Sequence, residues 1–173
     1  SPLALHVDAA NRQHYEVPAA FFQGCLGHRL KYSSCYYRTG RETLDQAEDA
    51  MLELYGQRAG LADGQGILEL GCGWGYFLDL AAERGYEVTG CTISRRQYEY
   101  ASELNRERIA SGQVTVLLED YRNMPGHYDS VGSTGFFEHV GSAFWAEHFS
   151  KVAGYLKPGG VAMVQTMLCN KFD

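Results

Sequence analysis

The sequence lacks an excess of basic residues, a paired-cysteine motif and a long apolar run. Its 15 Lys and Arg stand against 21 Asp and Glu, which leaves a net charge of −6. A nucleic-acid-binding surface normally shows a basic stripe, so we expect no nucleic-acid partner. The five cysteines form no CxxC pair, which argues against a zinc ribbon and a disulfide framework, and we expect no metal site. No apolar run is long enough to span a bilayer, so we expect no transmembrane segment.

The sequence also does not begin with methionine, and its first residues lead us to expect no secretory signal. It begins SPLALHVDAANRQ, with neither a charged start nor a long apolar segment. Reduced thiols in a chain without a signal peptide are typical of a cytoplasmic protein. Because the sequence does not begin with Met and stops soon after its last expected strand, we expect it to be processed or part of a longer protein.

What the sequence does contain is an alternation of apolar runs and helical patterns. Strands are expected at residues 67–70, 87–93, 114–118, 128–134 and 161–167. Helices are expected between them, up to about residue 85, over 94–111 and over 142–156. In the last helix, Phe144 and Trp145 are assigned to the core. Strands that alternate with helices predict a Rossmann-like α/β fold, with a mainly parallel sheet flanked by helices.

The N-terminal third of the chain has a different character. It is rich in aromatic residues, and Pro18 can open a short helix. Thr43 and Gln46 can form a capping box at the start of a longer one. We therefore divide the chain into an N-terminal helical cap, residues 1–60, and a Rossmann-like core, residues 61–173.

Three glycines follow the first core strand in the sequence LELGCGWG. Gly71, Gly73 and Gly75 allow the backbone to turn tightly and to approach a ligand, and ligands in such sheets bind beyond the carboxyl ends of the strands. The GxGxG spacing differs from the GxGxxG fingerprint of dinucleotide-binding proteins. The second strand also ends in the sequence TIS, without an acidic residue to hold a ribose diol. A nicotinamide-dependent oxidoreductase is therefore disfavoured.

The glycine-loop sequence ILELGCGWG resembles the first nucleoside-binding motif of class I S-adenosylmethionine-dependent methyltransferases. Other segments, LKYSSCYY, VTGCTIS, LLEDYRNM and GFFEHVG, resemble the cyclopropane-fatty-acyl-phospholipid synthase and coclaurine N-methyltransferase-like family within that class. The resemblance covers residues 13–167 in the family's order. It implies a Rossmann-like methyltransferase with S-adenosyl-L-methionine as its cofactor. The methyl group would pass by in-line displacement to a small-molecule amine or an unsaturated lipid acyl chain.

The resemblance also implies a role for each matching residue. The cofactor-binding set comprises Tyr32 and Ser33 over the sulfonium, Gly71 and Gly73 against the aminoacyl part, Thr92, Ile93 and Gln97 toward the ribose, and Asp120 and Tyr121 beside the adenine. Glu138 would be the catalytic residue, with His139 beside it, and would accept or steer the proton that an amine loses.

Two positions depart from the cyclopropane synthase branch. That branch carries a Cys in its YSCxY segment and a His in its fifth strand, which help to hold a bicarbonate ion, whereas this chain has Ser34 and Gln165. Ring closure needs a base, so these changes favour simple methyl transfer. Gly135, however, stands where the amine-methylating branch has a Glu, as in the lipid branch. The acceptor therefore stays open between an amine and an acyl chain.

Two further functions stay open for this sequence. One is a cyclopropane-fatty-acyl-phospholipid synthase proper. The second, from a different class, is a catalytically inactive module that binds the cofactor without transferring its methyl group. The sequence also leaves open whether the chain forms a homodimer and whether it makes transient contact with a membrane.

Overall fold

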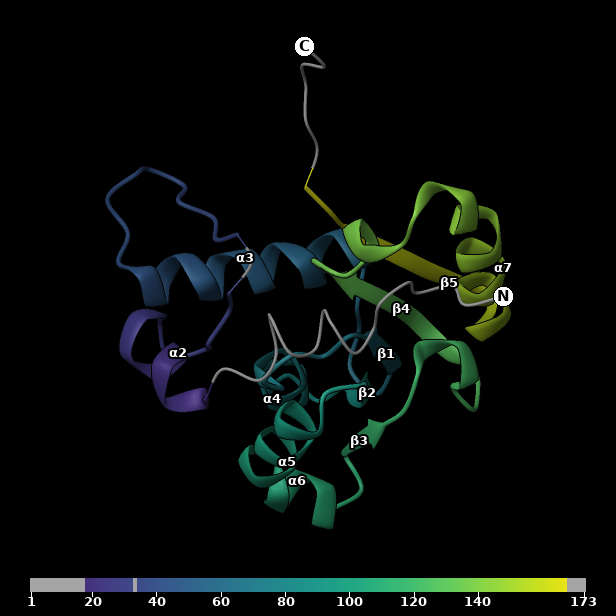
Figure 1. Cartoon of the computed structure of the whole chain (residues 1–173), viewed down its shortest axis with the longest axis horizontal. Helices are drawn as coiled ribbons and strands as arrows, with labels where there is room; N and C mark the ends of the chain where they lie inside the picture. Colours follow the sequence, from purple (N-terminus) through teal and green to yellow (C-terminus); the bar gives the residue numbers. More distant parts are fainter. Residues whose placement is uncertain (1–17, 33, 168–173) are drawn as a thin grey trace.

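The computed structural model describes residues 18–32 and 34–167, which form a parallel sheet flanked by helices (Figure 1). The strands are β1 Gly66–Leu70, β2 Glu87–Thr92, β3 Val114–Leu118, β4 Tyr128–Thr134 and β5 Leu156–Gln165. The helices are α2 Ala19–Cys25, α3 Leu44–Ala59, α4 Tyr76–Glu83, α5 Arg95–Leu104, α6 Arg106–Ala110 and α7 Trp145–Tyr155, with the short 3-10 turns η2 Tyr121–Asn123, η3 Phe137–His139 and η4 Ser142–Phe144. None of the helices within these residues is long and apolar enough to cross a membrane. The predicted α/β fold is confirmed.

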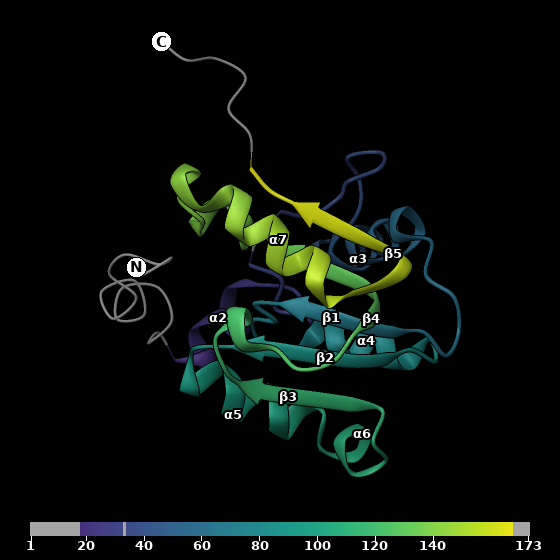
Figure 2. The ribbon, with the colours of Figure 1, turned by 90° about the vertical axis from the view of Figure 1, so that its right-hand side faces the viewer.

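The sheet has the strand order β3-β2-β1-β4-β5, and every neighbouring pair is parallel. β1 pairs with β2 on one side and with β4 on the other, so the chain first builds one half of the sheet and then returns to build the other (Figure 2). The strand order therefore reverses between β1 and β4. Ligands of open parallel sheets bind at such a switch point, beyond the carboxyl ends of the strands. The glycine loop lies there, directly after β1.

Alternate residues of β1 supply a separate core on each face of the sheet. Ile67 packs on one face, in a cluster with Tyr55 of α3 and Leu78 of α4. Leu68 packs on the opposite face, with Tyr155 of α7. Successive side chains of a strand point to opposite faces, and a central parallel strand must be apolar on both because helices cover both. All of β1 beyond its first residue is accordingly buried.

Helix α3 begins with the predicted capping box and ends against the sheet. Thr43 Oγ1 accepts a hydrogen bond from Gln46 N, and the Gln46 side chain accepts one from Thr43 N. Further along the helix, the Tyr55 hydroxyl donates to the Glu69 carboxylate of β1, with a distance of 3.0 Å between the oxygens. A helix predicted as part of the cap thus reaches the centre of the sheet.

The prediction of a single helix over residues 94–111 is wrong, because two helices, α5 and α6, meet there at Asn105. Asn105 is 1% exposed, and its Nδ2 donates to the carbonyl oxygens of Ala101, at 2.9 Å, and Gly75, at 3.3 Å. An asparagine side chain that bonds to backbone carbonyls competes with the helical hydrogen bonds. The hydrogen bond from Asn105 to Gly75 therefore connects the break between α5 and α6 with the glycine loop.

The face of α7 that packs on the sheet also differs from the predicted one. Trp145, expected in the core, is 47% exposed. The buried stripe of the helix runs instead through His148, Val152 and Tyr155, which follow the i, i+4, i+7 spacing of one helical face. His148 packs against several aromatic rings, among them that of Phe137, and burial lowers the pKa of its imidazole.

Candidate cofactor and active site

The loop between β1 and α4 has a backbone that glycine adopts readily and other residues do not. Gly71 and Gly73 have φ values of +74° and +55°. A Cβ atom added to Gly71 would lie 2.9 Å from the Phe136 ring, and one added to Gly73 would lie 3.4 Å from the Tyr32 ring. At Gly71 and Gly73 the loop therefore presents bare backbone, with an aromatic ring close to each of the two glycines.

A chain of hydrogen bonds connects Tyr32 with the end of β2. Gln97 Nε2 donates to the Tyr32 hydroxyl at 3.5 Å, and Gln97 Oε1 accepts from Thr92 Oγ1 at 2.9 Å. Ser94 Oγ, which caps α5, accepts from the backbone N–H of Gln97 at 3.3 Å. Thr92 and Gln97 are buried, whereas Ile93 is 42% exposed. The structure thus brings Tyr32, Thr92 and Gln97 together and leaves the Ile93 side chain partly in solvent.

Asp120 and Tyr121 follow β3 at the carboxyl edge of the sheet. Arg122 donates to both carboxylate oxygens of Asp120, from Nε at 2.8 Å and from a terminal nitrogen at 2.5 Å. Burial alone would raise the pKa of Asp120, but the hydrogen bonds from Arg122 outweigh it and hold the pKa below the ordinary value. The Tyr121 ring lies against that of Phe136, with 5.1 Å between centroids. Phe136 therefore links this pair to Gly71 of the glycine loop.

The two predicted catalytic residues lie on η3, just beyond β4. Glu138 is half-buried, and its Oε2 accepts a hydrogen bond from Thr166 Oγ1 at 3.4 Å. Lys31 is close enough to interact electrostatically with Glu138. His139, in contrast, is exposed. The predicted residue Ser33 lies outside the described residues.

Glu69 is a candidate site residue that the family motifs did not assign. It lies in β1 with 1% of its surface exposed. With Lys31, Gly71 and Gly73 it lines a cavity of about 60 Å³. Burial raises the pKa of Glu69 to about 7, although the Tyr55 hydroxyl donates to it. The sequence carried a signal for this residue, because an acidic side chain inside an apolar strand needs a partner or a function.

The neighbouring strand leaves room for this buried pair. A Cβ atom on Gly132 of β4 would lie 1.4 Å from the Tyr55 hydroxyl oxygen and 2.3 Å from Glu69 Oε2. Any larger residue at this position would displace both side chains. Gly132 is therefore required by the Tyr55–Glu69 hydrogen bond, which no local pattern around residue 132 indicates.

We expect Glu69→Gln to remove a pH-dependent part of the protein's stability. The native pKa of about 7 lies above the ordinary 4.5, so the native state binds more protons than the unfolded state between these values. The contribution of Glu69 is therefore fully present below the ordinary pKa and is lost as the pH rises through the native one. Glutamine still offers an acceptor to Tyr55 and cannot ionise. The free energy of unfolding of the variant should consequently fall less over this range.

Urea denaturation at about pH 5 and about pH 7.5 measures this difference. Glu87→Gln, at an exposed carboxylate of β2, is the matched control and should follow the wild type. If the stability of Glu69→Gln falls as steeply as that of the wild type, the assigned role of Glu69 is wrong.

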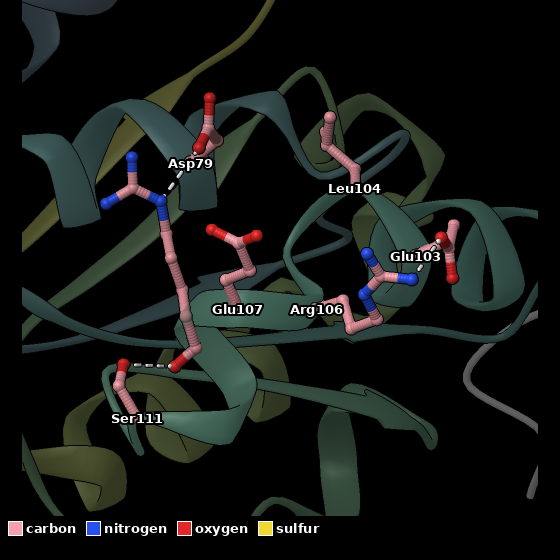
Figure 3. Close-up of a pocket in the computed structure, with 7 residues that line it drawn as sticks. Asp79, Glu103, Leu104, Arg106, Glu107 and Ser111 are labelled. Carbon is pink, nitrogen blue, oxygen red and sulfur yellow. Dashed lines mark hydrogen bonds and ion pairs between the residues drawn. The ribbon is translucent and has the colours of Figure 1, made fainter.

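A larger surface cavity, of about 550 Å³, lies beside α6 (Figure 3). Four of its charged groups form two ion pairs: Arg108 Nε lies 2.9 Å from Asp79 Oδ1, and a terminal nitrogen of Arg106 lies 3.3 Å from Glu103 Oε1. Helix α6 leads into the amino end of β3, whereas the glycine loop follows the carboxyl end of β1. This cavity is therefore separate from the candidate site.

Residues 6–173 match the sequence profile of the family described as mycolic acid cyclopropane synthetase. The chain belongs to this family. It is 32% identical over 163 residues to the cyclopropane-fatty-acyl-phospholipid synthase of Escherichia coli (strain K12), a match that covers 94% of this chain and 41% of that protein. It is 41% identical over 142 residues to the (S)-coclaurine N-methyltransferase of Thalictrum flavum subsp. glaucum, covering 80% of this chain and 39% of that protein.

The solved structures agree with this membership of the mycolic acid cyclopropane synthetase family. A mycolic acid cyclopropane synthase in complex with SAH (S-adenosylhomocysteine) is similar with a TM-score of 0.85 and 29% identity, over 94% of this chain and 57% of that one. The family resemblance of the sequence motifs and the class I methyltransferase fold are both confirmed. The chain spans about two fifths of the length of the curated relatives it matches. The roles of the individual site residues stay predictions.

Proposed function

We propose that the chain is the cofactor-binding core of an S-adenosylmethionine-dependent methyltransferase that methylates an amine. The observation that carries the proposal is the connected set of residues at the glycine loop. The Tyr32 ring lies above Gly73, and Gln97 bonds to both Tyr32 and Thr92. Membership of the family and the SAH in a relative's structure support the same cofactor.

The residues present fit this cofactor. A Cβ atom on Gly73 would fill part of the cradle, and the adjoining cavity offers the Glu69 carboxylate to an amino group. The Phe22 ring lies 5.3 Å from that of Trp74 and 6.0 Å from that of Tyr32, so aromatic rings, to which a sulfonium cation is attracted, cluster at the glycine loop. Bound S-adenosylmethionine would supply an electrophilic methyl group at this place.

Catalysis by this chain would rest on positioning and on one proton acceptor. The nitrogen to be methylated must be held about 3 Å from the methyl carbon and in line with the bond that breaks. Glu138, held by Thr166, would take the proton that the amine nitrogen loses. Phe136 and Phe137, both half-buried, directly precede Glu138 and would help to keep water away from it.

The choice of an amine rests on Ser34 and Gln165. Gln165 Nε2 donates a hydrogen bond to Ser34 Oγ. The two side chains that stand at the expected bicarbonate-holding positions therefore bind each other. Because the Ser34 hydroxyl and the Gln165 amide bond to each other, they are not directed at a bicarbonate ion, and this supports methyl transfer to an amine over ring closure on an acyl chain.

Product analysis tests the proposal. The full chain is incubated with methyl-labelled S-adenosylmethionine, a panel of amines and a lipid extract, and the products are analysed by mass spectrometry. We expect the label on amine nitrogens. Cyclopropanated or methylated acyl chains as the main product would overturn the amine acceptor and leave the cofactor in place. Cofactor binding without transfer to any acceptor would identify an inactive module.

We expect Asp120→Ala to weaken cofactor binding by roughly 1–3 kcal/mol, the usual cost of leaving a buried polar group unpaired, here the amino group of the adenine. The measurement is a calorimetric titration with S-adenosylhomocysteine. Glu107→Ala is the control, because this carboxylate of α6 is exposed and lies away from the carboxyl edge of the sheet, so it should leave the affinity unchanged. Wild-type affinity in Asp120→Ala, or an equal loss in both variants, would mean that the adenine binds elsewhere.

A further inference from the structure

The chain that carries Tyr32 is anchored firmly on its N-terminal side. The fully buried carboxylate of Glu48, on α3, accepts hydrogen bonds from three backbone N–H groups. These belong to Gly27, at 3.0 Å, Arg29, at 2.8 Å, and Lys31, at 3.2 Å. One acidic side chain of α3 thus holds the backbone of residues 27–31 directly before Tyr32.

Beyond Tyr32, the anchor comes from a distant strand. Ser34 Oγ accepts the hydrogen bond from Gln165 Nε2, at the end of β5, across 131 positions in the sequence. Two residues further on, the backbone N–H of Tyr36 donates to the carbonyl oxygen of Ala47 at 3.0 Å. Of these two contacts, the Ser34–Gln165 hydrogen bond is the one nearer to Tyr32.

The backbone on both sides of Tyr32 is in an unfavourable conformation. Leu30 has a φ of +45° and Ser34 a φ of +46°, in the left-handed region that residues with a Cβ atom rarely adopt. Such conformations persist where the surrounding structure determines them, and they are concentrated at ligand-binding sites. Glu48 supplies the constraint next to Leu30, and Gln165 supplies it at Ser34.

The end of β5 also reaches the candidate catalytic residue. Thr166, the residue after Gln165, donates its hydroxyl hydrogen bond to Glu138. Gln165 itself is half-buried, and its Oε1 atom is enclosed by the protein. Two successive residues therefore contact the Tyr32 segment and Glu138 respectively.

We infer that Gln165 is a positioning residue for the cofactor site. Through Ser34 it holds the Tyr32 ring against Gly73 of the glycine loop, and so raises the affinity for the cofactor without contacting it. The inference rests on the proposed function, since it takes the glycine loop as the cofactor cradle. The physical basis of this role is the hydrogen bond from Gln165, at the end of β5, to Ser34, in the segment that carries Tyr32.

A double-mutant cycle tests the inference. S-adenosylhomocysteine is titrated calorimetrically into the wild type, Ser34→Ala, Gln165→Met and the double variant. Alanine keeps the Cβ atom and the backbone conformation, and methionine keeps the approximate length of glutamine. We expect each single variant to bind about 2- to 10-fold more weakly, the effect of one neutral hydrogen bond, and the double variant to bind no more weakly than either, because both remove the same bond.

Two further variants sharpen the result. Gln57→Met, at an exposed glutamine of α3, is the matched control and should bind like the wild type. Ser34→Asn should keep most of the wild-type affinity that Ser34→Ala loses, because asparagine tolerates a positive φ and offers an oxygen to Gln165. If Ser34→Ala bound weakly only because the protein had become less stable, Ser34→Asn would not be expected to bind better. Affinity losses that add in the double variant would overturn the inference.

A second measurement needs no cofactor. Trypsin cleaves after lysine, so the rate of digestion at the bond between Lys31 and Tyr32 reports how often this segment opens. We expect faster cleavage there in Ser34→Ala and Gln165→Met than in Gln57→Met. Unchanged cleavage together with unchanged affinity would overturn the role of Gln165 and leave the proposed function intact. A wild type that does not bind S-adenosylhomocysteine would overturn both.

Discussion

Gly73→Val should abolish binding of S-adenosylmethionine and S-adenosylhomocysteine. Gly73 has a φ of +55°, and its Cβ position lies 3.4 Å from the Tyr32 ring. A valine side chain would fill the space between the loop and this ring, where we propose that the aminoacyl part of the cofactor binds. A β-branched residue is also strongly disfavoured at a positive φ. Calorimetric titration of the folded variant measures the effect.

The control must separate backbone strain from loss of the cradle. Gly112 has a φ of +81° with nothing within 4 Å of its Cβ position, and it lies before β3, away from the glycine loop. Gly112→Val therefore carries a similar conformational cost and should bind the cofactor with wild-type affinity. Undiminished binding by a folded Gly73→Val protein would show that the cofactor does not occupy this loop.

Glu138→Gln should reduce turnover of an amine acceptor by about 10²- to 10⁴-fold, the usual contribution of a positioned proton acceptor. Glutamine can still accept the hydrogen bond from Thr166, so the local structure and the cofactor affinity should change little. The loss should shrink as the pH rises, because more of the amine is then already deprotonated. The measurement is the turnover rate of wild type and variant over a range of pH.

Glu147→Gln is the matched control for this experiment. Glu147 is an exposed carboxylate in the first turn of α7, and its replacement should leave turnover unchanged. Full activity of Glu138→Gln on the true acceptor, at every pH, would make Glu138 a structural residue. The proton would then have to leave by another group.

The same variant distinguishes an amine from an acyl chain. If the acceptor is the alkene of an acyl chain, raising the pH should not rescue Glu138→Gln, since the acceptor has no proton to lose before attack. In that case, Ser34→Cys combined with Gln165→His should create or increase a cyclopropane product. No such product is expected if the amine acceptor is correct.

Much of the fold and part of the site depend on residues that are close in the sequence. The capping box of Thr43 and Gln46, the β1 strand and the turn through Gly71 and Gly73 each involve only a few successive positions, so composition and spacing predict them. Prediction fails where a distant group intervenes. The helix expected over 94–111 divides because the carbonyl oxygen of Gly75 lies within reach of an asparagine side chain.

By itself, the sequence determined a parallel α/β sheet, a glycine loop at its switch point and the family to which the chain belongs. The tertiary structure alone decided which side chains meet: Ser34 with Gln165, Glu138 with Thr166, and Tyr55 with Glu69. It also decided that α7 buries His148 and exposes Trp145. The reason is the range of the interactions. A hydrogen bond acts over about 3 Å between atoms, so its partner is set by how the sheet and helices pack, and no local pattern of residues records that.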